Sequence, residues 1–318
     1  MTTKKRIVRL ISNPNAGRGG RRRAAEVARF CELLGKRGIE VEVAQTRAPH
    51  DATRLAAEAA QANIGEVVAS GGDGTINEAL QGLIGTNVRL GIWPAGTANV
   101  LARELKLPFD AEGAAEVVAR GATRRIYAGC ATAERSGVRR YFFLMAGVGL
   151  DASVVEGVRP RLKRRVGEGA YWASGLEHLV RWQPVPFEIE IEGQTYPATF
   201  ASVGKAAHYG GDISVTPRAR LDEPEFEICV VNSYSRLRYF RLLLQGMRRD
   251  GVRRGMSSVR YVRATRARAT GDGASVQVDG ELIGQLPMTF EIVPTPIEVI
   301  APRPQEREGR RRGYQRLR

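Results

Sequence analysis

The sequence predicts an α/β domain with a mostly parallel sheet, followed by a second domain built mainly from β-strands. Short apolar strand patterns alternate with amphipathic helical patterns in the first third of the chain, and glycine-rich loops follow several of these strands. After about residue 124 the helical patterns become few, while strand patterns continue. Such alternation is typical of a parallel sheet with helices on both faces, and 318 residues are enough for two domains.

The elements of the first domain follow from apolar spacing and from stop signals. Ala24, Val27 and Cys31 recur at helical spacing, and Gly38 then ends that helix. Strands are expected over Arg6–Ser12, Ile39–Thr46, Glu66–Ser70 and Val88–Trp93, and helices over Gly20–Lys36, Asp51–Ala62, Thr75–Leu83 and Ala98–Lys106. We assign residues 1–125 to this domain.

The second domain is expected over residues 126–302, and a basic tail that we expect to be disordered over 303–318. Its helical patterns cover only Ala170–Trp182 and Leu237–Arg249. Strands are expected over Arg124–Thr132, Arg140–Ala146, Phe187–Glu192, Tyr196–Ser202, Phe226–Asn232, Ala274–Asp279 and Met288–Ile292.

Charge and cysteine content restrict the classes of function. The formal net charge of +15 favours phosphates, anionic lipid head groups or nucleic acid as partners, but a solvated basic surface without a partner stays open. Three cysteines without a Cys-x-x-Cys pair argue against a disulfide framework or a zinc site and favour a reducing cytoplasm. The longest apolar stretch is about ten residues, so no transmembrane helix is expected.

The loop Gly71–Glu78 follows a strand and opens a helix. Its glycines allow the backbone to approach a ligand, and the first N–H groups of the helix favour phosphate. Thr75 and Glu78 match a capping box, which would fix the start of the helix. A tight turn that binds nothing is the structural alternative, and phosphate binding is favoured over it because the turn needs fewer glycines.

Two further loops have the same character. Pro94–Asn99 follows the next strand, with Thr97 as the expected N-cap of the helix after it, although a simple capped turn explains this loop equally well. Asn13–Gly19 follows the first strand. The carboxyl ends of parallel strands share one edge of a sheet, so the loops could surround one nucleotide.

Together these loops resemble the nucleotide-binding motifs of the diacylglycerol kinase catalytic family, which includes bacterial diacylglycerol kinases and the sphingosine and ceramide kinases. Gly71–Gly74 alone is also similar to loops of phosphofructokinases and NAD kinases, but its combination with Gly96–Asn99 and Asp279–Glu281 is more specific. The resemblance spans nearly the whole chain and implies a phosphofructokinase- or NAD-kinase-like nucleotide domain, then a C-terminal β-sandwich. It implies ATP contacts at Asn13, Pro14, Asn15, Ala16, Gly17, Thr46, Gly71, Gly72, Asp73, Gly74, Thr75, Ile76, Asn77 and Thr97.

The resemblance also implies catalytic and metal-binding residues. Glu281 would accept the proton of a lipid hydroxyl, with Asp279 beside it, whereas the residues alone favour a hairpin turn. Mg²⁺ would neutralise the triphosphate, and Asp73 could help to hold it. A structural Mg²⁺ would be bound by the Arg220 carbonyl, the Glu223 side chain and the Glu225 carbonyl, although Glu223-Pro224 replaces the usual Asp-Gly of the family.

The expected function is an ATP-dependent lipid kinase of phospholipid metabolism, cytoplasmic and transiently attached to anionic membranes, with no specific nucleic acid. The basic run Arg159–Arg165 with Tyr171 and Trp172, and the arginine-rich tail, would contact head groups, unless they form only a solvated surface. A soluble-metabolite kinase, or a non-catalytic lipid- or nucleic-acid-binding protein, are the alternatives. The sequence specifies neither the acceptor lipid nor the oligomeric state.

Overall fold

The computed structural model describes residues 5–17, 20–150, 152, 183–208, 214–246 and 258–303. The expected helix at 170–182, the basic run at 159–165, Tyr171, Trp172 and the tail from residue 304 lie outside the described residues. The chain forms two compact units, Met1–Ile126 with Pro296–Arg318, and Tyr127–Thr295.

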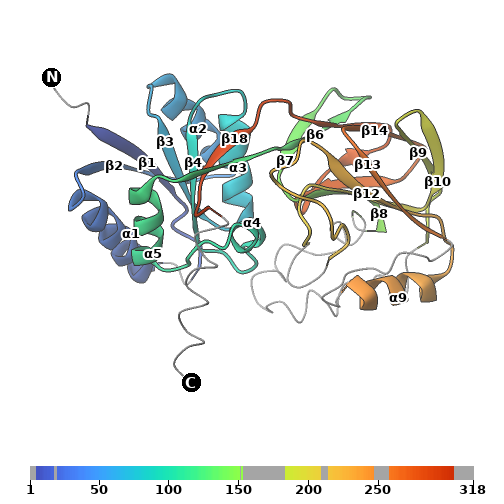
Figure 1. The fold of residues 1–318 in the computed structure, drawn as a ribbon, viewed down its shortest axis with the longest axis horizontal. Helices are drawn as coiled ribbons and strands as arrows, with labels where there is room; N and C mark the ends of the chain where they lie inside the picture. The colour runs from blue at the N-terminus through green and yellow to red at the C-terminus, as the bar shows by residue number, and fades with distance from the viewer. Residues whose placement is uncertain are drawn as a thin grey trace. The chain divides into compact units, whose positions relative to one another are not determined.

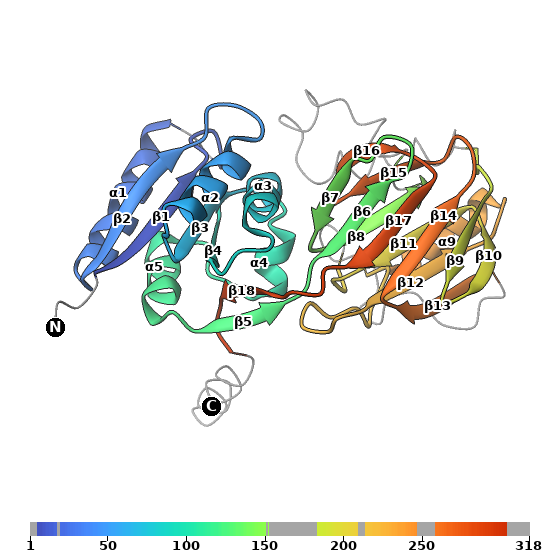
Figure 2. The ribbon, with the colours of Figure 1, turned by 90° about the horizontal axis from the view of Figure 1, so that it is seen from above.

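The first unit is an α/β domain with one six-stranded sheet of order β2-β1-β3-β4-β18-β5 (Figures 1 and 2). Its strands are β1 (Arg6–Ser12), β2 (Ile39–Gln45), β3 (Glu66–Gly71), β4 (Arg89–Pro94), β5 (Thr123–Ile126) and β18 (Ile297–Ile300). The first four strands and β18 run parallel, and β5 runs antiparallel to β18. The predicted mostly parallel sheet is confirmed.

Helices cover this sheet in two packed pairs, α1 with α5 and α2 with α3 (Figure 1). They are α1 (Gly20–Gly35), α2 (Asp51–Gln61), α3 (Asp73–Leu83), the short α4 (Val100–Glu104) and α5 (Ala111–Arg120). Every residue of β3 is buried, as expected for a strand covered on both faces. Phe30 of α1 stacks on Trp93 of β4 with ring centroids 4.8 Å apart, which joins the helix to the sheet.

The second unit contains two six-stranded sheets, of order β10-β9-β14-β17-β6-β7 and β13-β12-β11-β8-β15-β16 (Figure 2). All the strand pairs recorded in these sheets are antiparallel. The strands are β6 (Gly129–Ala133), β7 (Arg139–Phe142), β8 (Met145–Gly149), β9 (Phe187–Ile191), β10 (Gln194–Ala198), β11 (Phe200–Gly204), β12 (Phe226–Val231), β13 (Val259–Ala264), β14 (Arg266–Thr270), β15 (Ser275–Val278), β16 (Glu281–Gln285) and β17 (Met288–Ile292).

One apolar core joins the two sheets, as the sequence prediction of a β-sandwich requires. Phe142 of the first sheet stacks on Phe226 of the second, with ring centroids 5.8 Å apart. Side chains of β9 alternate between buried and exposed, so one face of the strand enters this core. Helix α9 (Arg236–Gly246) packs on the second sheet through Tyr239, beside Cys229 and Val231.

Several element boundaries differ from the sequence expectation. The segment expected as one strand over Arg124–Thr132 is divided between β5 and β6, which belong to different units. Strand β18 was included in the expected second domain but pairs with β4 and β5 of the first unit. Its partners are distant in sequence, so no local pattern indicates this pairing. The strands expected over Arg140–Ala146 and Tyr196–Ser202 also divide in two, and α5, β13, β14, β16 and β18 were not expected as elements.

Candidate active site

The glycine-rich loop between β3 and α3 forms a strand-to-helix turn. Helix α3 begins at Asp73, with Gly72 as its N-cap and no side-chain cap. The expected capping box is therefore absent, because both of its side chains bind elsewhere. The Thr75 hydroxyl accepts a hydrogen bond from the Asn13 side chain at 3.3 Å, and the Glu78 carboxylate accepts one from the Ala52 N–H at 3.2 Å.

The three glycine-containing loops of the first unit contact one another. Asn13 N–H donates to the Ser70 carbonyl at 2.9 Å, and Ala95 N–H donates to the Gly71 carbonyl at 2.8 Å. A Cβ on Gly96 would lie 2.5 Å from Gly72 Cα, so only glycine permits this approach. The structure thus brings together the loops after β1, β3 and β4, as the sequence predicted.

Asp73 connects two of these loops. Its carboxylate accepts a hydrogen bond from Val100 N–H at 2.8 Å, at the start of α4. The N-cap of α4 is Asn99, in a left-handed conformation, and not Thr97 as expected. Asn99 instead bonds to the backbone of Gly96 within its own loop. Burial raises the pKa of Asp73, while N–H groups of residues around Val100 lower it.

The other predicted ATP residues differ in exposure. Thr46 follows β2 at the same edge, and its N–H donates to the Ser12 carbonyl at 3.0 Å. Gly74 and Thr97 are exposed, whereas Ile76 and Asn77 are buried in the first turns of α3. A ligand at this edge would therefore meet Ile76 and Asn77 mainly through the backbone, because their side chains pack inside the domain.

Arg23 of α1 is a buried cation next to this loop that sequence reasoning missed. Its guanidinium lies 4.3 Å from the Trp93 ring centroid and donates to the Ser70 hydroxyl. That hydroxyl in turn donates to the Trp93 carbonyl at 3.2 Å. Arg23 shares the buried face of α1 with Phe30 and Leu34. This helical spacing was the available signal, and it distinguishes Arg23 from the arginines beside it.

The acidic segment Asp279–Glu281 lies in the second unit, where it turns the chain from β15 into β16. The Asp279 carboxylate accepts hydrogen bonds from Phe143, Leu144 and Met145 N–H at 2.9, 3.0 and 3.0 Å. Asp279 has a φ of 45°, which is rare outside glycine and asparagine-like residues. Its side chain therefore fixes the turn that carries Glu281.

Glu281 begins β16, and its carboxylate pairs with the guanidinium of Arg140. The Glu281 side chain is 43% exposed, whereas that of Arg140 is only 14% exposed. A largely buried arginine thus orients a carboxylate that solvent or a substrate can reach. Sequence reasoning identified Glu281 but not Arg140, since nothing local to β7 distinguishes it.

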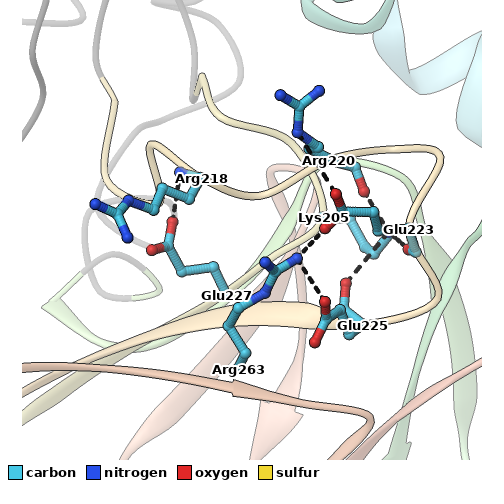
Figure 3. Close-up of polar contacts among 7 residues, drawn as sticks. All are labelled: Lys205, Arg218, Arg220, Glu223, Glu225, Glu227 and Arg263. Carbon is cyan, nitrogen blue, oxygen red and sulfur yellow. Dashed lines mark hydrogen bonds and ion pairs between the residues drawn. The ribbon is translucent and has the colours of Figure 1, made fainter.

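The expected structural metal ligands of the second unit bind another partner. The carbonyl oxygens of Arg220 and Glu225 accept hydrogen bonds from the Lys205 ammonium (Figure 3). The Glu223 carboxylate pairs with Arg263. Among the described residues, no group of three or more His, Cys, Asp or Glu side chains could hold a metal ion. Lys205 and Arg263 already bind the three oxygen-bearing groups that the implied site would use, so the residues present do not fit that site.

Comparison with known proteins connects both units to one family. Residues 7–131 match the family described as diacylglycerol kinase catalytic domain, and residues 145–301 match the YegS C-terminal NAD kinase beta sandwich-like domain. A diacylglycerol kinase of Mycobacterium tuberculosis is 32% identical over 300 residues, covering 93% of this chain and 95% of the relative. The chain belongs to the diacylglycerol kinase family.

Further similar proteins have lower identity, and the solved structures among them show the shared fold. That of Bacillus subtilis is 29% identical over 301 residues, covering 93% of this chain and 96% of the relative. A diacylglycerol kinase structure from Bacillus anthracis has a TM-score of 0.73 at 22% identity, covering 96% and 99% of the two chains. An Archaeoglobus fulgidus NAD kinase in complex with ATP shares the fold, with a TM-score of 0.54 at 14% identity and coverage of 96% and 98%.

Proposed function

We propose that this protein is an ATP-dependent lipid kinase that transfers the γ-phosphate to a hydroxyl of diacylglycerol or a related membrane lipid. The contact of the three loops at the carboxyl edge of the parallel sheet supports this proposal most strongly. Gly74, in the first turn of α3, has an exposed backbone at that edge, and helix N-termini favour phosphate. Family membership supports a kinase, and the lipid acceptor rests on the relatives.

In the proposed reaction, the loops hold the triphosphate and Glu281 accepts the proton of the lipid hydroxyl. The hydroxyl oxygen bonds to the γ-phosphorus while the bond from that phosphorus to the β–γ bridging oxygen breaks, so ADP is the leaving group. Arg140 orients Glu281, and Asp279 positions its hairpin through the three N–H groups that it binds. Mg²⁺ supplies charge neutralisation when it is bound to the triphosphate. Asp73 is the carboxylate of the loop that could contact that ion, and it also holds the start of α4 in place.

The substrate is tested by incubating the protein with labelled ATP and total lipid extract, then identifying the labelled product. We expect one phosphorylated lipid, with diacylglycerol among the accepted substrates. The shared fold of the NAD kinase makes a soluble-metabolite kinase the second candidate. Transfer to NAD or a sugar, with none to lipid, would replace the lipid kinase proposal.

Helix α9 supports a peripheral contact with the membrane in this proposal. Leu237 and Leu244 are exposed, and Tyr234 just before the helix is 65% exposed. Arg236 and Arg241 are also exposed on this helix. Apolar and basic residues exposed together are typical of helices that lie in a lipid interface. Within the described residues, no helix is long and apolar enough to cross a bilayer.

Vesicle sedimentation tests this contact. We expect Leu237→Ser with Leu244→Ser to reduce binding to vesicles containing phosphatidylglycerol by about 30-fold or more, because each lost leucine contributes roughly 1–2 kcal/mol. Val43→Ser with Val138→Ser is the control, since it removes two exposed apolar side chains elsewhere. Equal binding of the α9 variant and this control would exclude α9 as the contact.

A further inference from the structure

Lys205, directly after β11, has a side chain that is completely buried. Its Nζ donates hydrogen bonds to the carbonyl oxygens of Arg220 at 2.7 Å, Glu223 at 2.5 Å and Glu225 at 3.3 Å (Figure 3). Lysine is almost never fully buried unless it is paired. An ammonium has three donors and no acceptor, so these carbonyls satisfy it completely.

The surroundings of Lys205 favour its charged form, although burial opposes it. The pKa of Lys205 is lowered to about 8, chiefly by burial, while the carboxylates of Asp222 and Glu225 raise it and Arg263 lowers it. The Tyr127 ring centroid lies 6.0 Å from Nζ, so the electron-rich ring face adds to the stabilisation. Three carbonyl oxygens and the face of a ring thus surround Nζ, which is an environment suited to a cation.

The acidic side chains of the same loop are also neutralised from within the chain. Arg263 of β13 pairs with the carboxylates of both Glu223 and Glu225, the latter at 2.5 Å (Figure 3). Arg220 Nε lies 3.6 Å from the second oxygen of Glu223. A divalent ion would have to displace an ammonium and compete with two guanidinium groups, whereas Mg²⁺ and Ca²⁺ require several oxygen ligands at once.

We propose that the Lys205 ammonium is the resident cation of the loop Arg220–Glu225 and that this loop holds no divalent metal. The lysine binds both carbonyls that the family resemblance assigned to Mg²⁺, and Arg263 binds the assigned carboxylate. Because the cation is covalently attached, the order of the loop does not depend on metal concentration. This inference does not depend on the substrate of the enzyme.

Thermal unfolding of the nucleotide-free protein tests the inference. We expect the wild-type Tm to be the same in EDTA and in millimolar Mg²⁺ or Mn²⁺. Lys205→Met keeps the volume but removes the ammonium donor from three carbonyls, of which, in the described part of the chain, only that of Arg220 also accepts a hydrogen bond from the Glu223 N–H, so its Tm should fall by roughly 5 °C or more. Arg268→Gln is the matched control, because Arg268 pairs with Glu134 in the other sheet and is exposed; we expect its Tm to change little.

Two results would overturn the inference. One is a wild-type Tm that rises by several degrees with Mg²⁺ and loses this response in Glu223→Gln. The other is a Lys205→Met variant as stable as the wild type, since the ammonium would then contribute nothing. If Lys205→Met does not fold, crystals of the wild type soaked in Mn²⁺ decide. An anomalous peak beside the Arg220 carbonyl contradicts the inference, and its absence with Lys205 in place supports it.

Discussion

The carboxylates of two aspartates in the proposed site accept hydrogen bonds from backbone N–H groups. Asp73 accepts a hydrogen bond from Val100 N–H at the start of α4, and Asp279 accepts hydrogen bonds from three consecutive N–H groups that end at the first residue of β8. A carboxylate that accepts N–H groups fixes a loop as a charged hydrogen-bond acceptor. The sequence predicted both aspartates as site residues. It did not predict their backbone partners, because the donor N–H groups come from segments distant in sequence.

A substitution at Gly96 tests the contact between the glycine-containing loops after β3 and β4, which we propose bind the triphosphate. In Gly96→Ala the new Cβ would lie 2.5 Å from Gly72 Cα, which forces the two backbones apart. We expect ATP binding to weaken by about tenfold or more, measured by isothermal titration calorimetry, because small displacements of a binding loop are costly. Gly65→Ala is the control, since its Cβ would meet no atom within 4 Å. Unchanged ATP affinity in Gly96→Ala would argue against this loop as the nucleotide site.

Cys229 gives a pH dependence with a defined sign. Burial raises the pKa of its thiol from 9.0 to about 12. Above pH 9 the thiol of the unfolded chain loses its proton, while the folded protein keeps it. The stabilisation that this group contributes is therefore fully present below pH 9 and is lost as the pH rises toward 12. We measure the free energy of unfolding in urea for the wild type and for Cys229→Ala. The difference between the two should fall by about 1 kcal/mol between pH 7 and pH 10. An unchanged difference would contradict the raised pKa.

At the scale of elements, a buried ion network joins the parallel strands. Glu66 of β3 accepts two hydrogen bonds at 2.7 Å from Arg6 of β1 and also pairs with Arg89 of β4. Arg6 also donates to the carbonyls of Val118 and Ala119 in α5. The network therefore ties one helix end to three neighbouring strands.

We expect Glu66→Gln to lower the free energy of unfolding by about 3 kcal/mol, because it leaves two arginines without their buried counter-charge. The Glu66 side chain is only 3% exposed. Glu42→Gln is the control: Glu42 pairs with Arg9 at 2.6 Å but is exposed, so its loss should cost less than about 1 kcal/mol. Urea unfolding measures both, and equal losses would contradict the network's role.

The elements of the first unit were predicted more accurately than those of the second. Buried strands separated by helices and glycine loops are strongly marked in sequence. In the second unit, β10 and β11 meet at Thr199 without a glycine or proline between them, so they were expected as one strand. In β14, exposed arginines alternate with buried alanines, which is a strand pattern that the sequence analysis missed. The role of Lys205 as a buried cation could not be predicted from the sequence, because its carbonyl partners come together only in the folded loop.

At the scale of the whole molecule, the first unit is built from both ends of the sequence. The chain leaves it after Ile126 and returns at Pro296, where β18 inserts between β4 and β5. A fragment of residues 1–125 would therefore lack the strand that joins β4 to β5. The residues of the proposed reaction are likewise divided, since the loops proposed to bind the triphosphate belong to the first unit and Glu281 belongs to the second.

The turnover of Glu281→Gln tests the central claim most directly. Glutamine keeps an oxygen that Arg140 can bind but cannot accept a proton, so we expect kcat to fall by about 100-fold or more while the ATP affinity stays within about threefold. Asp272→Asn is the matched control, because Asp272 is an exposed partner of Arg135 in the same unit and should keep full activity. Near-wild-type lipid phosphorylation by Glu281→Gln would contradict Glu281 as the base, and with it the proposed transfer.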